Sequence, residues 1–154
     1  MTDTEAPGAT AALSVLSADE CYRLLGTHEI GRVGLPAERW PLILPVNYAL
    51  DGTTIVLRTH AGTILRAADQ ADVAFEVDDF DRRTRTGWSV LVLGRAEEVG
   101  ERHGADLVAA TRATGLEPWA PGDKGHWLRI VPHEISGRRI VPGELPGLDL
   151  RGYL

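Results

Sequence analysis

The spacing of apolar and polar positions predicts a mainly β protein with a few short helices. Cys21 and Leu24 recur at helical spacing after a capping box of Ser17 and Glu20, which predicts a helix near 18–26. From residue 30 the period shortens, and apolar runs bounded by turn residues predict strands over 30–35, 42–50, 54–59, 73–77, 88–99 and 127–135. Further helices are expected over 63–70 and 104–113.

Turn residues indicate how these elements are connected. Asp51-Gly52 between two strands is a strong hairpin signal. Pro45 lacks the N–H of a central ladder position, so we expect a bulge or a sheet edge there. The segment 137–139 either continues the last strand or turns away from it.

Strands joined by hairpins, with helices between them, favour an antiparallel barrel-like sheet of about six strands with peripheral helices. A strict alternation of strand and helix would have predicted a parallel sheet instead. The sequence contains 17 glycines, which suit the turns and bends of such a barrel. We expect one domain over residues 15–140, a flexible N-terminal tail over 1–14 and a C-terminal tail over 141–154.

Composition and charge narrow the function classes. The 154 residues carry a formal charge of −6, which argues against nucleic acid as a partner. The longest apolar stretch is far shorter than the ~20 residues of a membrane-spanning helix, and the first residues do not resemble a signal peptide. A single cysteine allows no internal disulfide. We expect a soluble, cytoplasmic protein without membrane contact.

Common catalytic motifs are absent from the sequence. There is no phosphate-binding G-x-x-x-x-G-K-[ST], no H-E-x-x-H and no G-x-S-x-G. Cys21 lies on the apolar side of its expected helix and is interpreted as a buried thiol. We nominate no catalytic residue and no metal ligand.

One segment carries features of a phosphate site. Arg58 and Thr59 end a strand, Gly62 permits a close approach, and Thr63 opens a helix. A guanidinium, two hydroxyls and free backbone N–H groups suit a phosphate monoester. The other interpretation is an ordinary strand-to-helix turn.

Two further segments stand out. Residues 78–90 are expected to form a long charged connection ending on Trp88 and Ser89, which could flank a planar ligand and donate a hydrogen bond to it. Trp119 lies between Pro118 and Pro121, so it either closes the rim of the core or lies at an interface.

The order of these segments resembles one family. They read L-P-V-N-Y at 44–48, V-L-R-T-H-A-G-T at 56–63, F-E-V-D-D-F-D at 75–81, R-T-G-W-S-V-L-V-L-G-R-A at 85–96, P-W-A-P-G at 118–122 and L-R-I-V-P-H-E-I-S-G-R-R at 128–139. Over about residues 15–140 the chain resembles the pyridoxamine 5′-phosphate oxidase-like flavin-binding split-barrel proteins, in the actinobacterial branch near nitroimidazole-resistance proteins. The resemblance implies a six-stranded antiparallel split β-barrel and a homodimer with flavin sites at the subunit interface.

The resemblance also implies cofactor-binding roles for individual residues. The residues that match the family's phosphate segment are Arg58, Thr59, Gly62 and Thr63. Those that match the strand beside the isoalloxazine ring are Pro45, Val46 and Asn47. Those that match the lining of the same pocket are Trp88, Ser89 and Val90. Trp119 and Arg129 match more loosely and could come from the partner subunit.

The chain departs from the family at Ile64, where many relatives have a lysine that helps to hold the phosphate. Losing one charge-assisted contact costs about 1.5–3 kcal/mol, or about one to two decades in affinity. Arg58 or Arg66 could compensate.

The resemblance leads to an FMN-dependent oxidoreductase of unknown substrate, with a small-molecule electron donor and acceptor. A deazaflavin coenzyme could occupy the same groove. The alternatives are a non-catalytic protein that binds or senses flavin or haem, with His60 as the nearest haem ligand, and a dimeric interaction module with a vestigial pocket.

Overall fold

The computed structural model of the protein describes residues 11–142. Within this range the helices are α1 (Ala18–Leu25), α2 (Thr63–Ala68) and α3 (Ala105–Ala113). The strands are β1 (Ala12–Leu16), β2 (Ile30–Leu35), β3 (Leu42–Asp51), β4 (Thr54–Thr59), β5 (Ala71–Asp81), β6 (Thr86–Glu98) and β7 (His126–Val141).

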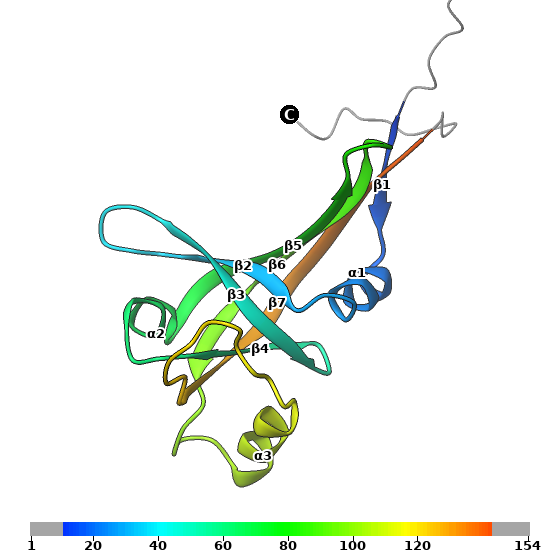
Figure 1. The fold of residues 1–154 in the computed structure, drawn as a ribbon. Coiled ribbons are helices and arrows are strands. Elements are labelled where there is room, and N and C mark those ends of the chain that lie inside the picture. The colour runs from blue at the N-terminus through cyan, green and yellow to red at the C-terminus, as the bar shows by residue number, and fades with distance from the viewer. Residues whose placement is uncertain (1–10, 143–154) are drawn as a thin grey trace, which may run out of the picture.

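The strands form a closed antiparallel barrel. Their order is β1-β7-β4-β3-β2-β5-β6, and a further pairing of β6 with β7 closes six of them into a ring, with β1 as an extra strand on β7 (Figure 1). The predicted six-stranded antiparallel barrel with peripheral helices is confirmed. Its interior holds the aliphatic and aromatic core, in which Phe75, Leu57 and Ile130 are almost fully buried.

The charged segment 78–90 is not the long connection that its composition predicts. β5 and β6 stay paired from Ala71 opposite Ala96 out to Asp81 opposite Thr86, so only residues 82–85 turn. This two-stranded extension, together with β7 and β1, forms an arm that projects from the barrel (Figure 1). Alternating Asp and Arg side chains suit its faces because most of them lie in solvent.

The first strand is the element that the pattern failed to predict. β1 pairs with the end of β7, from Ala12 opposite Val141 to Leu16 opposite Gly137, so residues 12–14 of the expected tail belong to the sheet. Residues 1–10 and 143–154 of the two expected tails lie outside the described residues. β7 continues through Gly137, where a Cβ would stand 2.6 Å from the Cys21 Sγ. The glycine thus lets α1 pack against the sheet, and Cys21 is fully buried, as predicted.

Local sequence signals explain the helix ends. The predicted capping box of α1 is present, with the Ser17 hydroxyl accepting from the Glu20 N–H and the Glu20 side chain accepting from the Ser17 N–H. α3 ends before Gly115, which takes the left-handed φ of 65°. In the described part of the chain, no helix is long and apolar enough to cross a membrane.

Pro45 lies on a local sheet edge, as predicted. β3 pairs with β2 through Pro45 opposite Arg32, but its pairing with β4 begins only at Tyr48. The side of β3 that faces away from β2 is therefore open near Pro45. A cavity begins at this opening.

Candidate functional site

The largest concentration of predicted site residues lies around one cavity of about 360 Å³. Its walls come from the open part of β3, the end of β4 with the turn after it, and the loop between α3 and β7 (residues 114–125, the α3–β7 loop). The lining residues are Ile30, Pro45, Val46, Asn47, Arg58, Thr59, His60, Ile64, Pro118, Trp119, Ala120 and Lys124. The volume lies within the ~300–1,000 Å³ of small-molecule sites.

The cavity has an apolar part and a polar part. Ile30, Val46 and Ile64 contribute aliphatic surface, and Trp119 contributes an indole ring. Arginine, lysine, histidine, threonine and asparagine side chains supply the polar groups, and no carboxylate lines the cavity. In a chain with a net charge of −6, these residues give the cavity walls a local excess of positive charge, which favours anions.

Arg58 lines the cavity but uses its guanidinium to hold the α3–β7 loop. Its Nε donates to the carbonyl oxygen of Lys124 at 3.2 Å, and its Nη1 donates to that of Leu116 at 2.9 Å. The guanidinium carbon also lies 4.6 Å from the centre of the Trp127 ring. These contacts make Arg58 a positioning group for one wall of the site.

Asn47 joins the same loop to β3 from the other side. Its Nδ2 donates to the carbonyl oxygen of Glu29 at 3.3 Å, and its Oδ1 accepts from the backbone N–H of Trp119 at 2.9 Å. The Trp119 side chain remains 68% exposed at the rim of the cavity. A large aromatic side chain left in solvent beside a cavity is available to cover a planar ligand.

Thr59 and His60 complete the wall at the end of β4. Thr59 is buried, and its hydroxyl donates to the carbonyl oxygen of His60 at 3.3 Å. The His60 ring packs on Gly62, where a Cβ would stand 2.8 Å from the His60 Nε2. Gly62 thus makes room for His60 and does not itself line the cavity.

The other predicted site residues lie elsewhere. Thr63 is the first residue of α2 and borders a separate surface depression with Arg66. Trp88 and Ser89 belong to β6, and the Trp88 ring packs edge-on against His28 with centroids 5.0 Å apart. Val90 is fully buried in the core, so its side chain cannot contact a ligand in the cavity. The structure therefore brings Pro45, Val46, Asn47, Arg58 and Thr59 together at the cavity, but none of the β6 group.

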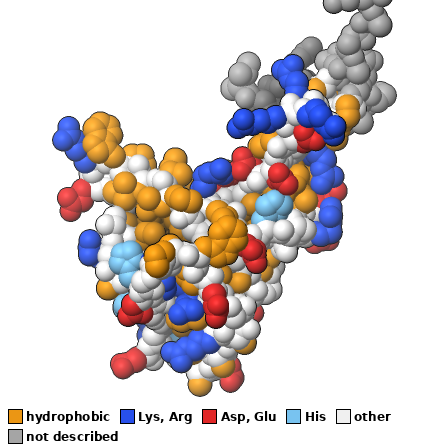
Figure 2. Space-filling model, in the orientation of Figure 1, with side chains coloured by type: hydrophobic (Ala, Val, Ile, Leu, Met, Phe, Trp, Pro, Cys, Tyr) orange, Lys and Arg blue, Asp and Glu red, His pale blue; other side chains and the backbone are white. Residues whose placement is uncertain are grey.

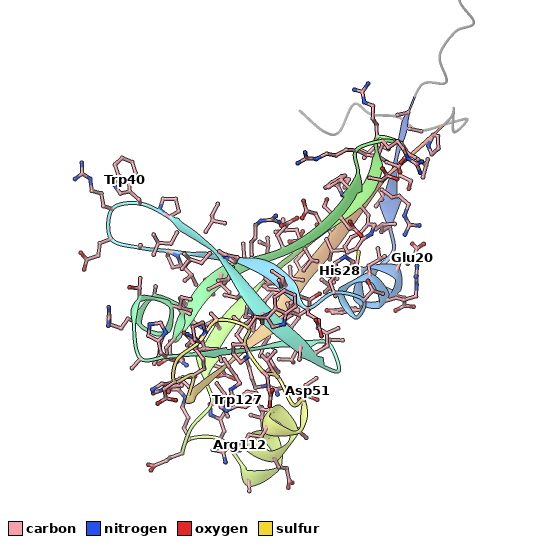
Figure 3. All side chains as sticks on the ribbon, viewed as in Figure 1. Glu20, His28, Trp40, Asp51, Arg112 and Trp127 are labelled. Atoms are coloured by element: carbon pink, nitrogen blue, oxygen red, sulfur yellow. The ribbon has the colours of Figure 1, made fainter. Side chains whose placement is uncertain are left out.

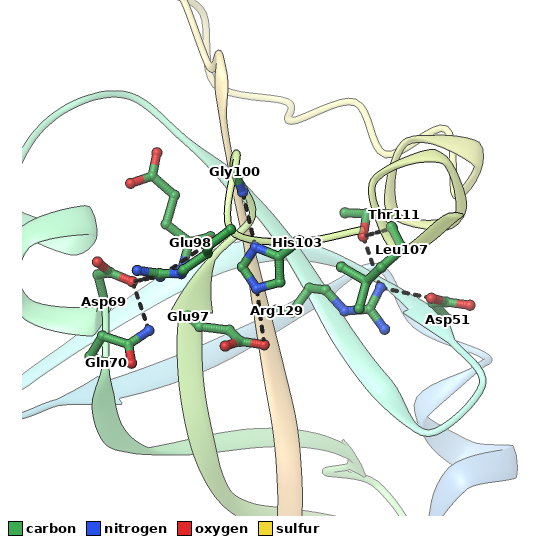
Figure 4. Close-up of polar contacts among 11 residues, drawn as sticks. Asp51, Asp69, Gln70, Glu97, Glu98, Gly100, His103, Leu107, Thr111 and Arg129 are labelled. Atoms are coloured by element: carbon green, nitrogen blue, oxygen red, sulfur yellow. Dashed lines mark hydrogen bonds and ion pairs between the residues drawn. The ribbon is translucent and has the colours of Figure 1, made fainter. Parts of the chain in front are cut away.

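Arg129 has a structural role rather than the loosely assigned cofactor contact. It is buried, and its Nη1 lies 2.7 Å from the Asp51 carboxylate and 2.8 Å from the Thr111 hydroxyl. Figure 4 shows these contacts joining α3 to the β3–β4 turn. A guanidinium already satisfied by an ion pair and a hydroxyl is not free for a ligand.

Apolar side chains continue from the cavity across the outer face of the sheet. Ile43 on β3, Gly34 on β2, Ala74 on β5 and Leu93 on β6 are neighbours across successive strands. Ile43 is 70% exposed and Leu93 is 40% exposed. Figure 2 shows hydrophobic side chains gathered over the β2–β3 hairpin, and Figure 3 places Trp40 at its tip. We call Ile43, Gly34, Ala74, Leu93 and the neighbouring Leu91 the apolar sheet face.

An ion-pair cluster lies beside this face. Arg32 Nη1 lies 2.9 Å from a Glu76 oxygen and 2.8 Å from an Asp78 oxygen. Burial raises the pKa of the Glu76 carboxyl, although its hydrogen bond from Arg32 works in the opposite direction. Among residues 11–142, no three His, Cys, Asp or Glu side chains are arranged to hold a metal ion.

Lys124 is the site residue that sequence reasoning missed. It sits in the α3–β7 loop and lines the cavity. A signal was present, because Lys124 is the only lysine in the sequence. Its significance appears only when the loop is placed over β4.

Comparisons with known proteins agree with the fold. A profile of the pyridoxamine 5′-phosphate oxidase family matches residues 17–139. An uncharacterised protein of Mycobacterium tuberculosis is 36% identical over 132 residues, covering 82% of this chain and 84% of its own.

Two solved structures are similar as well. One is the FAD-binding protein of Mycobacterium smegmatis, with a TM-score of 0.70, 39% identity, and coverage of 82% of this chain and 98% of that protein. The other is an FAD-binding protein of Mesorhizobium loti, with a TM-score of 0.66, 26% identity, and coverage of 86% and 99%.

Proposed function

The chain belongs to the pyridoxamine 5′-phosphate oxidase family, and on that premise we propose that it is an oxidoreductase that uses a flavin nucleotide held in the cavity between β3, β4 and the α3–β7 loop. The observation that carries the proposal is the division of this cavity into an apolar part and a cationic, carboxylate-free part. A flavin nucleotide has the same division, since a planar ring system is joined to an anionic phosphate. The relative at 39% identity is described as FAD-binding, which adds FAD to the expected FMN.

The residues present fit such a ligand in defined roles. Pro45, Val46 and Trp119 would contact the ring system, because they line the cavity with apolar surface. Lys124 would face the phosphate end, because its ammonium is suited to an anion. A bound flavin supplies the electron-transfer chemistry, while the protein binds it, orients it and excludes water.

A second copy of the chain is part of the proposal. Pro45 lines the cavity, and Ile43, two residues away on the same side of β3, belongs to the apolar sheet face, where Ile43 and Leu93 are left in solvent. A contiguous apolar face next to a ligand cavity is typical of an interaction surface. We infer that a partner copy packs on this face and completes the wall of the cavity, as the family resemblance implies.

Analysis of the protein as purified tests the proposed function. The full chain is denatured, the released small molecules are identified by mass spectrometry, and the emptied protein is titrated with FMN, FAD and a deazaflavin coenzyme. We expect a yellow preparation and a rise in melting temperature with flavin, since a ligand that binds only the folded state stabilises it. A colourless protein whose stability does not respond to any of the three would refute the proposal.

The non-catalytic alternatives are separated by a second measurement. An enzyme's bound flavin is bleached by a reduced nicotinamide and recovers its colour when an acceptor is added, whereas a storage or sensing protein shows no turnover. Haem binding has weaker support. His60 lines the cavity, but its ring is packed on Gly62 rather than directed by a hydrogen bond toward a ligand position.

A further inference from the structure

The only lysine of this chain is placed at the candidate flavin site. Lys124 is the single lysine in 154 residues, and it lines the cavity. Four arginines have carboxylate partners: Arg32, Arg95, Arg102 and Arg129 each pair with an aspartate or glutamate. Within residues 11–142 the Lys124 ammonium has neither a hydrogen bond nor an ion pair. The cavity therefore contains one cation without a partner.

The surroundings of Lys124 favour an anionic ligand. No aspartate or glutamate lines the cavity, so nothing in its walls neutralises the ammonium. Ile64 lines the same cavity and contributes only apolar surface. The Thr59 hydroxyl also lines the cavity, but it donates its proton to the carbonyl oxygen of His60 and is not free to donate to a phosphate. An ammonium in a partly enclosed site without a counter-charge is stabilised when a phosphate enters.

Arg58 holds the backbone that carries this lysine. Its Nε donates to the carbonyl oxygen of Lys124 itself, and its Nη1 donates to that of Leu116 near the start of the loop. One guanidinium on β4, a strand paired with both β3 and β7, thereby holds both ends of the α3–β7 loop over the cavity. Arg58, which the sequence analysis assigns to the phosphate, thus contacts the backbone of Lys124, whose ammonium is free to bind a phosphate.

We propose that Lys124 binds the phosphate of the flavin nucleotide and that Arg58 acts as a positioning residue by holding the Lys124 backbone in place. The inference rests on the proposed function and adds to it the residue that distinguishes a phosphorylated flavin from riboflavin. Because the contact is a charge-assisted hydrogen bond, its loss lowers affinity by about 10- to 100-fold.

The test compares FMN with riboflavin, which has the same ring system and no phosphate. Lys124→Gln should weaken FMN by about 10- to 100-fold and leave riboflavin unchanged. Lys124→Arg should retain most of the FMN affinity. Arg112→Gln is the matched control, since it removes one cation from an exposed position on α3 and should change neither affinity. An unchanged ratio of FMN to riboflavin affinity in Lys124→Gln would overturn the inference while leaving the proposed function intact.

A double-mutant cycle tests the positioning role of Arg58. If Arg58 acts through Lys124, Arg58→Ala lowers the FMN-to-riboflavin affinity ratio in the natural chain but not in a Lys124→Gln background. A purely structural role would lower both affinities alike and leave the ratio unchanged in either background, and this result would contradict the role given to Arg58.

Chemical labelling tests the inference without any substitution. An amine-reactive reagent can modify only one side chain of this protein, Lys124, in addition to the terminal amine. Peptide mass spectrometry should find Lys124 labelled in the emptied protein and protected by FMN, with riboflavin protecting it less. Equal labelling with and without bound FMN would overturn the inference, and failure to bind any flavin would overturn the proposed function together with it.

Discussion

The side-chain oxygen of Asn47 accepts a hydrogen bond of 2.9 Å from the backbone N–H of Trp119, 72 residues further along the chain. This contact ties the α3–β7 loop to β3 on one side of the cavity, while Arg58 ties it to β4 on the other. The loop that covers the site is thus held by side chains of both β3 and β4. A site whose walls are fixed before the ligand arrives loses less entropy on binding.

Removing the Asn47 acceptor should loosen this loop. For Asn47→Ala we expect flavin affinity to fall about fivefold to tenfold, the equivalent of about 1–1.5 kcal/mol for one hydrogen bond. Asn47→Asp keeps an oxygen acceptor for the Trp119 N–H. Because its added carboxylate would repel a phosphate, the two variants are compared with riboflavin, for which Asn47→Asp should retain more affinity than Asn47→Ala. Fluorescence titration of the flavin measures the effect, and equal losses in the two variants would contradict the role of the acceptor.

Breaking the contact of Arg129 with Asp51 should destabilise the fold without a specific effect on the cavity. Asp51→Asn leaves a buried guanidinium without its counter-charge, and because the Asp51 side chain is 33% exposed we expect a loss of about 1–3 kcal/mol. Urea unfolding measures the loss. Glu101→Gln, which removes a carboxylate from an exposed position, is the matched control and should cost little.

The Thr111 hydroxyl accepts a second hydrogen bond from Arg129. Substitutions at Thr111 distinguish the contribution of this hydrogen bond to stability from that of the packing of the threonine methyl group. Thr111→Ser keeps the hydroxyl and should stay close to the natural stability, whereas Thr111→Ala should not. If Thr111→Ser and Thr111→Ala were equally unstable, packing of the buried methyl group, and not the hydrogen bond, would account for the effect.

The capping box of α1 predicts a pH dependence of stability. Hydrogen bonds from the backbone N–H and then the hydroxyl of Ser17 hold the pKa of Glu20 below its usual value of 4.5. A carboxyl with a lowered pKa stabilises the folded state above the unfolded pKa, and this contribution is lost as the pH falls through the folded pKa. The natural chain should therefore lose stability below pH 4.5 in part through Glu20.

A glutamine at this position completes a capping box without titrating. Glu20→Gln should therefore show a shallower loss of stability in acid, measured as melting temperature against pH. A variant with the same acid slope as the natural chain would mean that Glu20 contributes nothing to it.

The apolar sheet face predicts a dimer that a single charge disrupts. Leu93→Glu places a carboxylate in the proposed interface, where its desolvation is costly, and should shift the protein toward monomer in sedimentation velocity. Ala110→Glu adds the same charge at an exposed position on α3 and should leave the assembly unchanged. A natural chain that sediments as a monomer would remove the partner copy from the proposal.

Much of the fold is readable from local pattern, because it depends on neighbours in sequence. The capping box at Ser17 and Glu20, the Asp51-Gly52 turn and the apolar period of each barrel strand act over a few residues, and each produced the expected element. The edge position of Pro45 follows from its missing N–H in the same way.

What the sequence alone could not decide depends on pairing across long separations. The composition of segment 78–90 predicts a charged loop, but most of it forms strands because β5 and β6 pair along their full length. β1 forms by pairing with β7, and its own residues do not predict a strand. From its charge and position, Arg58 is expected to bind a phosphate. In the structure its guanidinium instead donates to backbone carbonyl oxygens of a loop about 60 residues away in sequence. Only the folded barrel brings that loop, with the chain's one lysine, to the cavity. Every residue has a backbone carbonyl, so the residue types do not show which carbonyl will accept a hydrogen bond; the three-dimensional position decides it.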